Sequence, residues 1–203
     1  LVGLKIPVEA FKETTKGGEV ISAEITTSET DAEVQYVNVF GYIYPVDESA
    51  PNIEWRMLLP MKWNGRSVQL GGGANNGSIP KLTGTGSVGG EIAIDKGYVV
   101  YGDDSGHQAE SSMDASFASN DEALSNYTRL HLIKAYDAMC YVTNAFYGQS
   151  SQFKPLRVRP AAARRWNARR PTQILRRHFL LRTGFQLRAS FAHVGRDSFA
   201  GGL

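Results

Sequence analysis

A glycine-rich segment holds the first residues whose types and spacing could do chemistry. Gly71, Gly72 and Gly73 follow directly on a short apolar stretch, residues 67–70. Because glycine has no Cβ, such a loop can turn its backbone N–H groups toward a ligand. Two N–H groups that point into a water-poor site stabilise an oxyanion. A flexible turn is one alternative. A phosphate loop is another, but the Gly-Lys-Ser/Thr ending of a P-loop is absent.

A second polar set follows the apolar run at 98–101. It contains Asp103, Asp104 and, three residues further on, His107. Open α/β sheets bind ligands at the carboxyl ends of their strands, so Asp104 and His107 are expected to support a site there. His107 could orient a substrate or brace the glycine loop by a hydrogen bond; a structural histidine is the alternative. Two adjacent carboxylates without further spaced ligands do not indicate a metal, and no cofactor is expected.

A nucleophile is the element that the sequence does not provide. No Gly-x-Ser-x-Gly motif occurs anywhere in the chain. Ser87, in Ser-Val-Gly-Gly, imitates part of such a motif, but no strand precedes it as a nucleophile turn requires. Ser105 is a loop serine and a poor candidate, while His131 is expected to be solvated or packed. The catalytic Ser, Asp and His are therefore not identifiable.

The elements that must position these residues alternate between strands and helices. Strands are predicted at 20–27, 34–44, 53–59, 67–70 and 98–101, and a short helix at 91–96. A capping box, Ser119-x-x-Glu122, begins a long helix that Gly148 ends. This order predicts an α/β protein with an open sheet built by right-handed crossovers.

The chain changes character near residue 155. Residues 1–154 contain 11 Lys+Arg and 19 Asp+Glu, a net charge of −8, whereas residues 155–203 contain 11 Arg and one acid, a net charge of +10. Two regions are therefore expected: an α/β portion at 1–150, and an irregular, poorly ordered Arg-rich tail at 151–203. Taken at face value, the tail could contact nucleic acid or an acidic partner, which would make the protein a non-enzymatic binding protein. That alternative is less favoured.

Composition excludes several classes. The single cysteine, Cys140, rules out an internal disulfide framework and a cysteine-based zinc cluster, and is expected to be a small buried hydrophobe. No apolar run is long enough to cross a membrane, so no membrane partner is expected. The first residues lack the pattern of a signal peptide, which predicts that such a segment was never present or has been removed.

Several stretches resemble the tannase/feruloyl esterase family of serine esterases. The resemblance spans about residues 37–150 in order and spacing, and is carried by residues 41–45, 59–66, 68–77, 97–107 and 115–123. It implies the N-terminal half of an α/β-hydrolase fold, with Gly71, Gly72 and Gly73 as the oxyanion loop. It also implies small aromatic, phenolic esters as substrates and a secreted or periplasmic location. The family's large lid often binds calcium; we expect the lid, and with it any calcium site, to be absent from this chain.

The chain departs from the family after Gly148. The family continues into a strand, a Cys-Ser-x-Gly-Gly nucleophile turn, and later the triad Asp and His; none of these is present. Shifted by one base, the codons of residues 175–178 permit Phe-Asp-Gly-Ile, and those of 182–186 permit Ala-Pro-Ala-Phe-Asn. Both strings resemble the family's sequence after its nucleophile. The opposite shift over 160–164 permits Gly-Cys-Ser-Thr, a weaker match. We therefore expect the residues from about 150–155 onward to be a frameshift product and the chain to be inactive.

Overall fold

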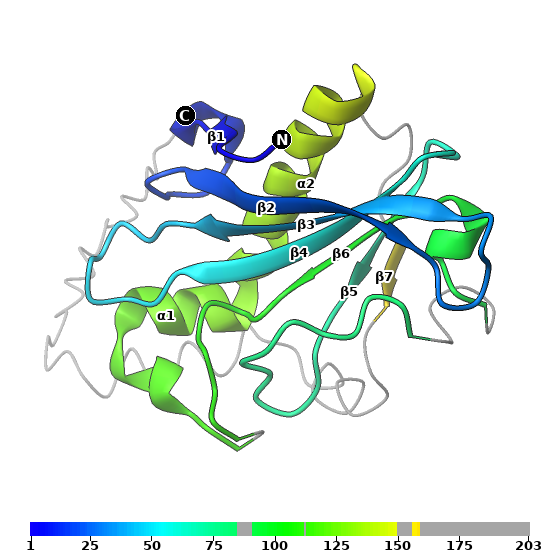
Figure 1. Ribbon diagram of the computed structural model, residues 1–203. Helices are drawn as coiled ribbons and strands as arrows, with labels where there is room; N and C mark the ends of the chain where they lie inside the picture. Colours follow the sequence, from blue (N-terminus) through cyan, green and yellow to red (C-terminus); the bar gives the residue numbers. More distant parts are fainter. Residues whose placement is uncertain (85–90, 112, 150–155, 159–203) are drawn as a thin grey trace, which may run out of the picture. The chain divides into compact units, whose positions relative to one another are not determined.

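The computed structural model describes residues 1–84, 91–111, 113–149 and 156–158, all within one compact unit. The described strands form a single seven-stranded sheet in the order β1-β2-β3-β4-β6-β5-β7 (Figure 1). They are β1 (Lys5–Ile6), β2 (Gly18–Thr27), β3 (Gln35–Ile43), β4 (Ile53–Pro60), β5 (Ser67–Leu70), β6 (Val99–Asp103) and β7 (Leu156–Val158).

The sheet has an antiparallel and a parallel part. Strands β1 to β4 pair antiparallel, and β4 pairs antiparallel with β6, whereas β5 pairs parallel with β6 on one side and with β7 on the other. The chain thus leaves β5 for its neighbour on one side and later returns to the other side. The carboxyl end of β5 is therefore a topological switch point, where open sheets bind ligands.

Alternating side chains of the strands build a core on each face of the sheet. One face packs on the long helix and contains Met57, Leu59, Val99 and Tyr101 together with Met139 of that helix. The other face packs on the segment between β5 and β6. Its buried residues are Tyr36, Leu58, Val68, Leu70, Leu82, Ala93, Ile94 and Val100. Because both faces are covered, every residue of β5 and β6 is buried, including the polar Ser67, Gln69 and Asp103.

The predicted long helix is interrupted by a wider turn. It consists of α1 (Asp121–Ser125), a turn of π-helix η4 (Asn126–Leu130) and α2 (His131–Tyr147), which lies across the sheet in Figure 1. Gly148 ends α2 in the left-handed conformation, as predicted, with its N–H donating to the Asn144 carbonyl. Shorter 3₁₀ turns lie at Val8–Ala10 (η1), Ile94–Lys96 (η2) and Ser116–Ser119 (η3).

The predicted capping box is wrong. The N-cap of α1 is Asn120, whose side-chain oxygen accepts from the Ala123 N–H, while the Ser119 hydroxyl donates to Ser116. The Glu122 carboxylate instead accepts from the N–H groups of residues 46 and 47, at 2.9 and 2.7 Å. This acid therefore anchors the loop after β3 rather than the helix start.

The α/β class and the five predicted strands are confirmed, each strand within two residues at either end. Two short strands, β1 and β7, were not predicted. β7 lies inside the segment expected to be irregular, where Leu156–Val158 pairs with Val68–Leu70. The remainder of that segment, 151–155 and 159–203, lies outside the described residues.

Cys140 on α2 is half-buried and packs against the core, so it is less buried than the small buried hydrophobe that was expected. Burial raises the pKa of the Cys140 thiol, because the thiolate would lose hydration. We expect Ellman's reagent at pH 8 to react at least about tenfold more slowly with the folded protein than with the urea-unfolded chain. Since Cys140 is the only cysteine in the sequence, the absorbance change reports this thiol alone. Equal rates in both states would contradict a buried thiol.

Candidate functional site

The two loops that the sequence singled out lie side by side at the carboxyl ends of β5 and β6. The Gly77 N–H donates to the Asp104 carbonyl at 3.2 Å, and the Gly77 carbonyl accepts from the Ala109 N–H at 2.9 Å. These bonds join the segment 71–77, called here the glycine loop, to the segment 103–109, called here the β6 turn. The structure therefore brings together Gly71, Gly72, Gly73, Asp104 and His107 in one region, as the sequence predicted.

Asn76 fastens the glycine loop to the β6 turn. Its side-chain amide donates to the Ser105 hydroxyl at 2.6 Å and to the Asp103 carbonyl at 3.3 Å. The same side chain lies against Gly72, where an ideal Cβ would be 1.5 Å from the Asn76 Oδ1. Only glycine therefore fits at position 72 in this conformation. The sequence analysis did not give Asn76 a role, although it lies inside the glycine loop.

The glycine loop presents free backbone donors. Within the described residues, no protein acceptor takes the N–H of Gly72 or of Gly73. Both residues line a cavity of about 540 Å³. The complete lining is Gly71, Gly72, Gly73, Asn76, Ser78, Pro80, Ala109, Glu110 and Ser111. Two adjacent N–H groups at a cavity wall can stabilise a developing oxyanion.

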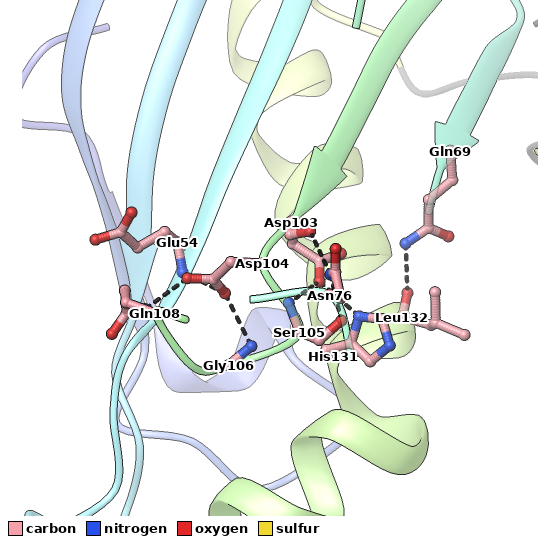
Figure 2. A network of polar contacts seen from close by, with 10 residues as sticks. All are labelled: Glu54, Gln69, Asn76, Asp103, Asp104, Ser105, Gly106, Gln108, His131 and Leu132. Atoms are coloured by element: carbon pink, nitrogen blue, oxygen red, sulfur yellow. Dashed lines mark hydrogen bonds and ion pairs between the residues drawn. The ribbon is translucent and has the colours of Figure 1, made fainter. Parts of the chain in front are cut away.

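Asp104 is buried beneath the β6 turn and is held by three donors. Its Oδ1 accepts from the N–H of Gly106 at 2.8 Å and of Glu54 at 3.2 Å, and its Oδ2 accepts from Gln108 at 2.5 Å (Figure 2). Burial raises the pKa of Asp104 to about 8, although the hydrogen bonds from Gly106 and Gln108 oppose this rise. Asp104 therefore supports the turn and faces away from the cavity-lining residues.

Asp103 and His131 form a second polar contact at this edge (Figure 2). The Nδ1 of His131 lies 2.5 Å from the Asp103 Oδ1, which also accepts from the Ser105 N–H at 2.9 Å. The Asp103 carboxylate is buried, with a side-chain exposure of 2%, and the imidazole is nearly so. The sequence analysis set both residues aside, since nothing in the spacing relates position 103 to position 131.

His107 is buried but does not brace the glycine loop by a hydrogen bond, which corrects that expectation. Among the described residues, neither of its ring nitrogens has a hydrogen-bond partner. Its ring packs edge-on against Phe117 and Tyr127, at 4.8 and 5.7 Å between centroids. Burial lowers the pKa of His107, so the imidazole is neutral near pH 7. His107 thus supports the loop by packing.

The serines that imitate a nucleophile do not form one in the described structure. The Ser105 hydroxyl is bound by the Asn76 amide, and Ser105 has a left-handed backbone with φ of 69°. Ser87 lies outside the described residues. Among the residues that the structure does describe, no group of three His, Cys, Asp or Glu could hold a metal ion, and no helix is long and apolar enough to span a membrane.

β7 adds a third carboxyl end to this edge of the sheet. Because Val158 pairs with Leu70 in a parallel ladder, the end of β7 lies beside the start of the glycine loop. In α/β-hydrolases the nucleophile follows a strand directly, and the glycine loop supplies one oxyanion donor. The carboxyl ends of β5, β6 and β7 therefore lie next to one another at this edge of the sheet.

Residues 37–154 match the family model described as tannase and feruloyl esterase. An uncharacterised esterase of Agrobacterium fabrum is 42% identical over 137 residues, which cover 65% of this chain and 25% of that protein. The chain therefore spans a quarter of the length of this curated relative.

Among solved structures, the crystal structure of feruloyl esterase B from Aspergillus oryzae matches with a TM-score of 0.55 and 17% sequence identity. The match covers 75% of this chain and 32% of that one. It shows the fold, and so confirms the partial α/β-hydrolase fold that was predicted from the sequence.

Proposed function

Since this chain belongs to the tannase and feruloyl esterase family, we propose that it carries the oxyanion-binding part of a carboxylic ester hydrolase. The substrates would be aromatic, phenolic esters, cleaved through a serine acyl-enzyme. One observation supports the proposal: Gly72 and Gly73 line a cavity at the carboxyl end of β5, and their N–H groups have no acceptor among the described residues.

The described residues account for the electrostatic part of this reaction. When a nucleophile attacks the ester carbonyl, its oxygen gains negative charge, and the N–H groups of Gly72 and Gly73 would donate to that oxygen. These donors cost no reorganisation during the reaction because Asn76 and the Asp104 carbonyl already hold the loop in place. Asp104 and His107 act beneath the loop as supports rather than as acid or base.

The attacking serine is the missing part. A serine hydrolase places it on a sharp turn directly after a strand, but residues 151–203 contain no serine within a nucleophile motif. We propose that the α/β portion, 1–150, is followed by an Arg-rich tail, 151–203, read out of frame. The chain with this tail would bind no substrate productively and would not turn over. The nucleic-acid alternative rests on the tail alone, of which only residues 156–158 are described.

Substrate and location follow from the relatives' names and the family. The structural relative is a feruloyl esterase, which supports a phenolic acid ester as the substrate class. A secreted or periplasmic location is proposed on the family alone. No cofactor is proposed for the described site, and a calcium ion would belong to the family's lid.

Hydrolysis of methyl gallate and methyl ferulate tests the proposal. The coding DNA is first resequenced from codon 140 past the stop. This chain and the product of the corrected frame are then assayed in parallel, with the nucleophile Ser→Ala variant of the corrected product as the control. We expect turnover only by the corrected product. Turnover by the chain as it stands, or a corrected frame broken by stop codons, would refute the frameshift; an inactive, folded corrected product would refute the esterase assignment.

A further inference from the structure

We infer that His131 is a positioning residue for the glycine loop and acts through Asp103 and Asn76. The inference rests on the proposed function, because it concerns the donors that would bind the oxyanion. It goes beyond that function in assigning a role to a helix residue that neither lines the cavity nor belongs to the glycine loop.

The first link joins the helix to the β6 turn. The His131 Nδ1 is hydrogen-bonded to the Asp103 Oδ1, on a carboxylate that is almost fully buried. A buried carboxylate is costly unless donors surround it. Among the described residues, the Ser105 N–H donates to it at 2.9 Å, and His131 donates to it in the tautomer that carries the proton on Nδ1. The Asp103 carboxylate thereby holds Ser105 in a left-handed conformation that a non-glycine residue does not adopt freely.

The second link joins the β6 turn to the glycine loop. The Asn76 amide donates both to the Ser105 hydroxyl and to the Asp103 carbonyl, so its position depends on the two residues that His131 orders. Asn76 in turn lies against Gly72, since a Cβ added at Gly72 would clash with the Asn76 side chain. A path from the imidazole to Gly72 therefore runs through Asp103, Ser105 and Asn76.

The π-helical turn lies where the helix contacts both the β6 turn and the glycine loop. A π-turn holds one more residue than a regular α-turn and so changes which side chains face the sheet edge; such turns recur at functional sites. Here the turn Asn126–Leu130 ends immediately before His131. From the same turn, the Tyr127 hydroxyl reaches the Ala74 carbonyl of the glycine loop at 3.5 Å. The helix thus contacts the loop directly and through Asp103.

Hydrogen–deuterium exchange of this full chain tests the inference. Two variants are compared: His131→Phe keeps a ring but loses the donor, whereas His131→Asn keeps an N–H donor at the position of Nδ1. We expect His131→Phe to raise exchange in residues 71–77 by about tenfold or more, with residues 35–43 of β3 unchanged. His131→Asn should restore near wild-type exchange in the loop.

A merely structural role gives a different result. Wild-type exchange of the loop in His131→Phe would overturn the inference, as would an equal rise in the loop and in β3. If His131→Phe fails to fold, Asn76→Gly is used instead, because it removes the last side chain between the β6 turn and Gly72. Glycine tolerates the positive φ of 55° at position 76. Asn76→Gly should raise hydrogen–deuterium exchange in residues 71–77 and leave residues 103–107 protected from exchange. If residues 71–77 stay protected, the inference is also overturned. No turnover is needed, so failure here is distinct from failure of the esterase proposal.

Discussion

Replacing Gly77 by alanine is expected to destabilise the protein by roughly 3–5 kcal/mol, the range of severe single substitutions. An ideal Cβ at this position would lie 2.1 Å from the Ala109 Cβ and 2.9 Å from both the Ala109 N and the His107 Nε2. Gly77 also has a φ of 83°, which is unfavourable for any residue with a Cβ. To relieve this clash, the glycine loop and the β6 turn would have to separate. Their separation would break the two backbone hydrogen bonds of Gly77.

A matched control separates the clash from the backbone conformation. Gly148, at the end of α2, has a φ of 71° but no heavy atom within 4 Å of an added Cβ. Gly148→Ala should therefore cost only the left-handed conformation, about 1–2 kcal/mol. Urea unfolding of both variants followed by circular dichroism measures the difference. Equal losses would mean that the two loops can part without penalty, and the close packing at Gly77 would then be irrelevant to stability.

The glycine loop could be placed from the sequence because two local signals coincide there. Residues 67–70 are a short stretch containing Val68 and Leu70, and three consecutive glycines follow it and end the strand. Both signals lie within a few consecutive residues, so they can be recognised from the sequence without knowledge of the tertiary structure. The same holds for Gly148, whose left-handed conformation ends α2 where the helical pattern stops.

The contacts within the site could not be predicted because they join distant segments. Glu122 fits a capping box by its spacing, yet its carboxylate binds the backbone N–H of Val46 and Asp47, some 75 residues away. Asn120 is as good a capping residue as Ser119, and only the tertiary structure decides between them. His131 directly follows a π-turn and contacts Asp103, and a hydrophobic periodicity does not predict a π-turn.

β7 illustrates the same limit for a strand. Leu156–Val158 has three residues, too few to show an alternation, and follows a change in composition that suggested irregular structure. Its pairing partner, β5, lies about 90 residues earlier in the chain. Whether such a short strand forms depends on the open edge of the parallel sheet that it pairs with, rather than on the β-propensity of its own residues.

The unfolding free energy should fall as the pH rises from about 5 to 8, because of Asp104. Burial raises the pKa of this carboxyl to about 8 in the folded protein, whereas an aspartate in an unfolded chain titrates near 4. Between these values the folded state holds a proton that the unfolded state has released. The stabilisation is therefore complete below pH 4 and is lost progressively toward pH 8, by up to about 1.4 kcal/mol per pH unit.

Asp104→Asn isolates this effect from the other titrating groups. The asparagine resembles the protonated carboxyl, and its oxygen can still accept from the Gly106 N–H, while the Gln108 amide can turn to accept from its new N–H. Urea unfolding of both proteins at pH 5, 6, 7 and 8 should show the wild type losing several kcal/mol relative to the variant. Parallel curves would mean that Asp104 is already ionised at pH 5. In that case the three donors around its carboxylate outweigh its burial, and the β6 turn is held by a charge rather than by a neutral acid.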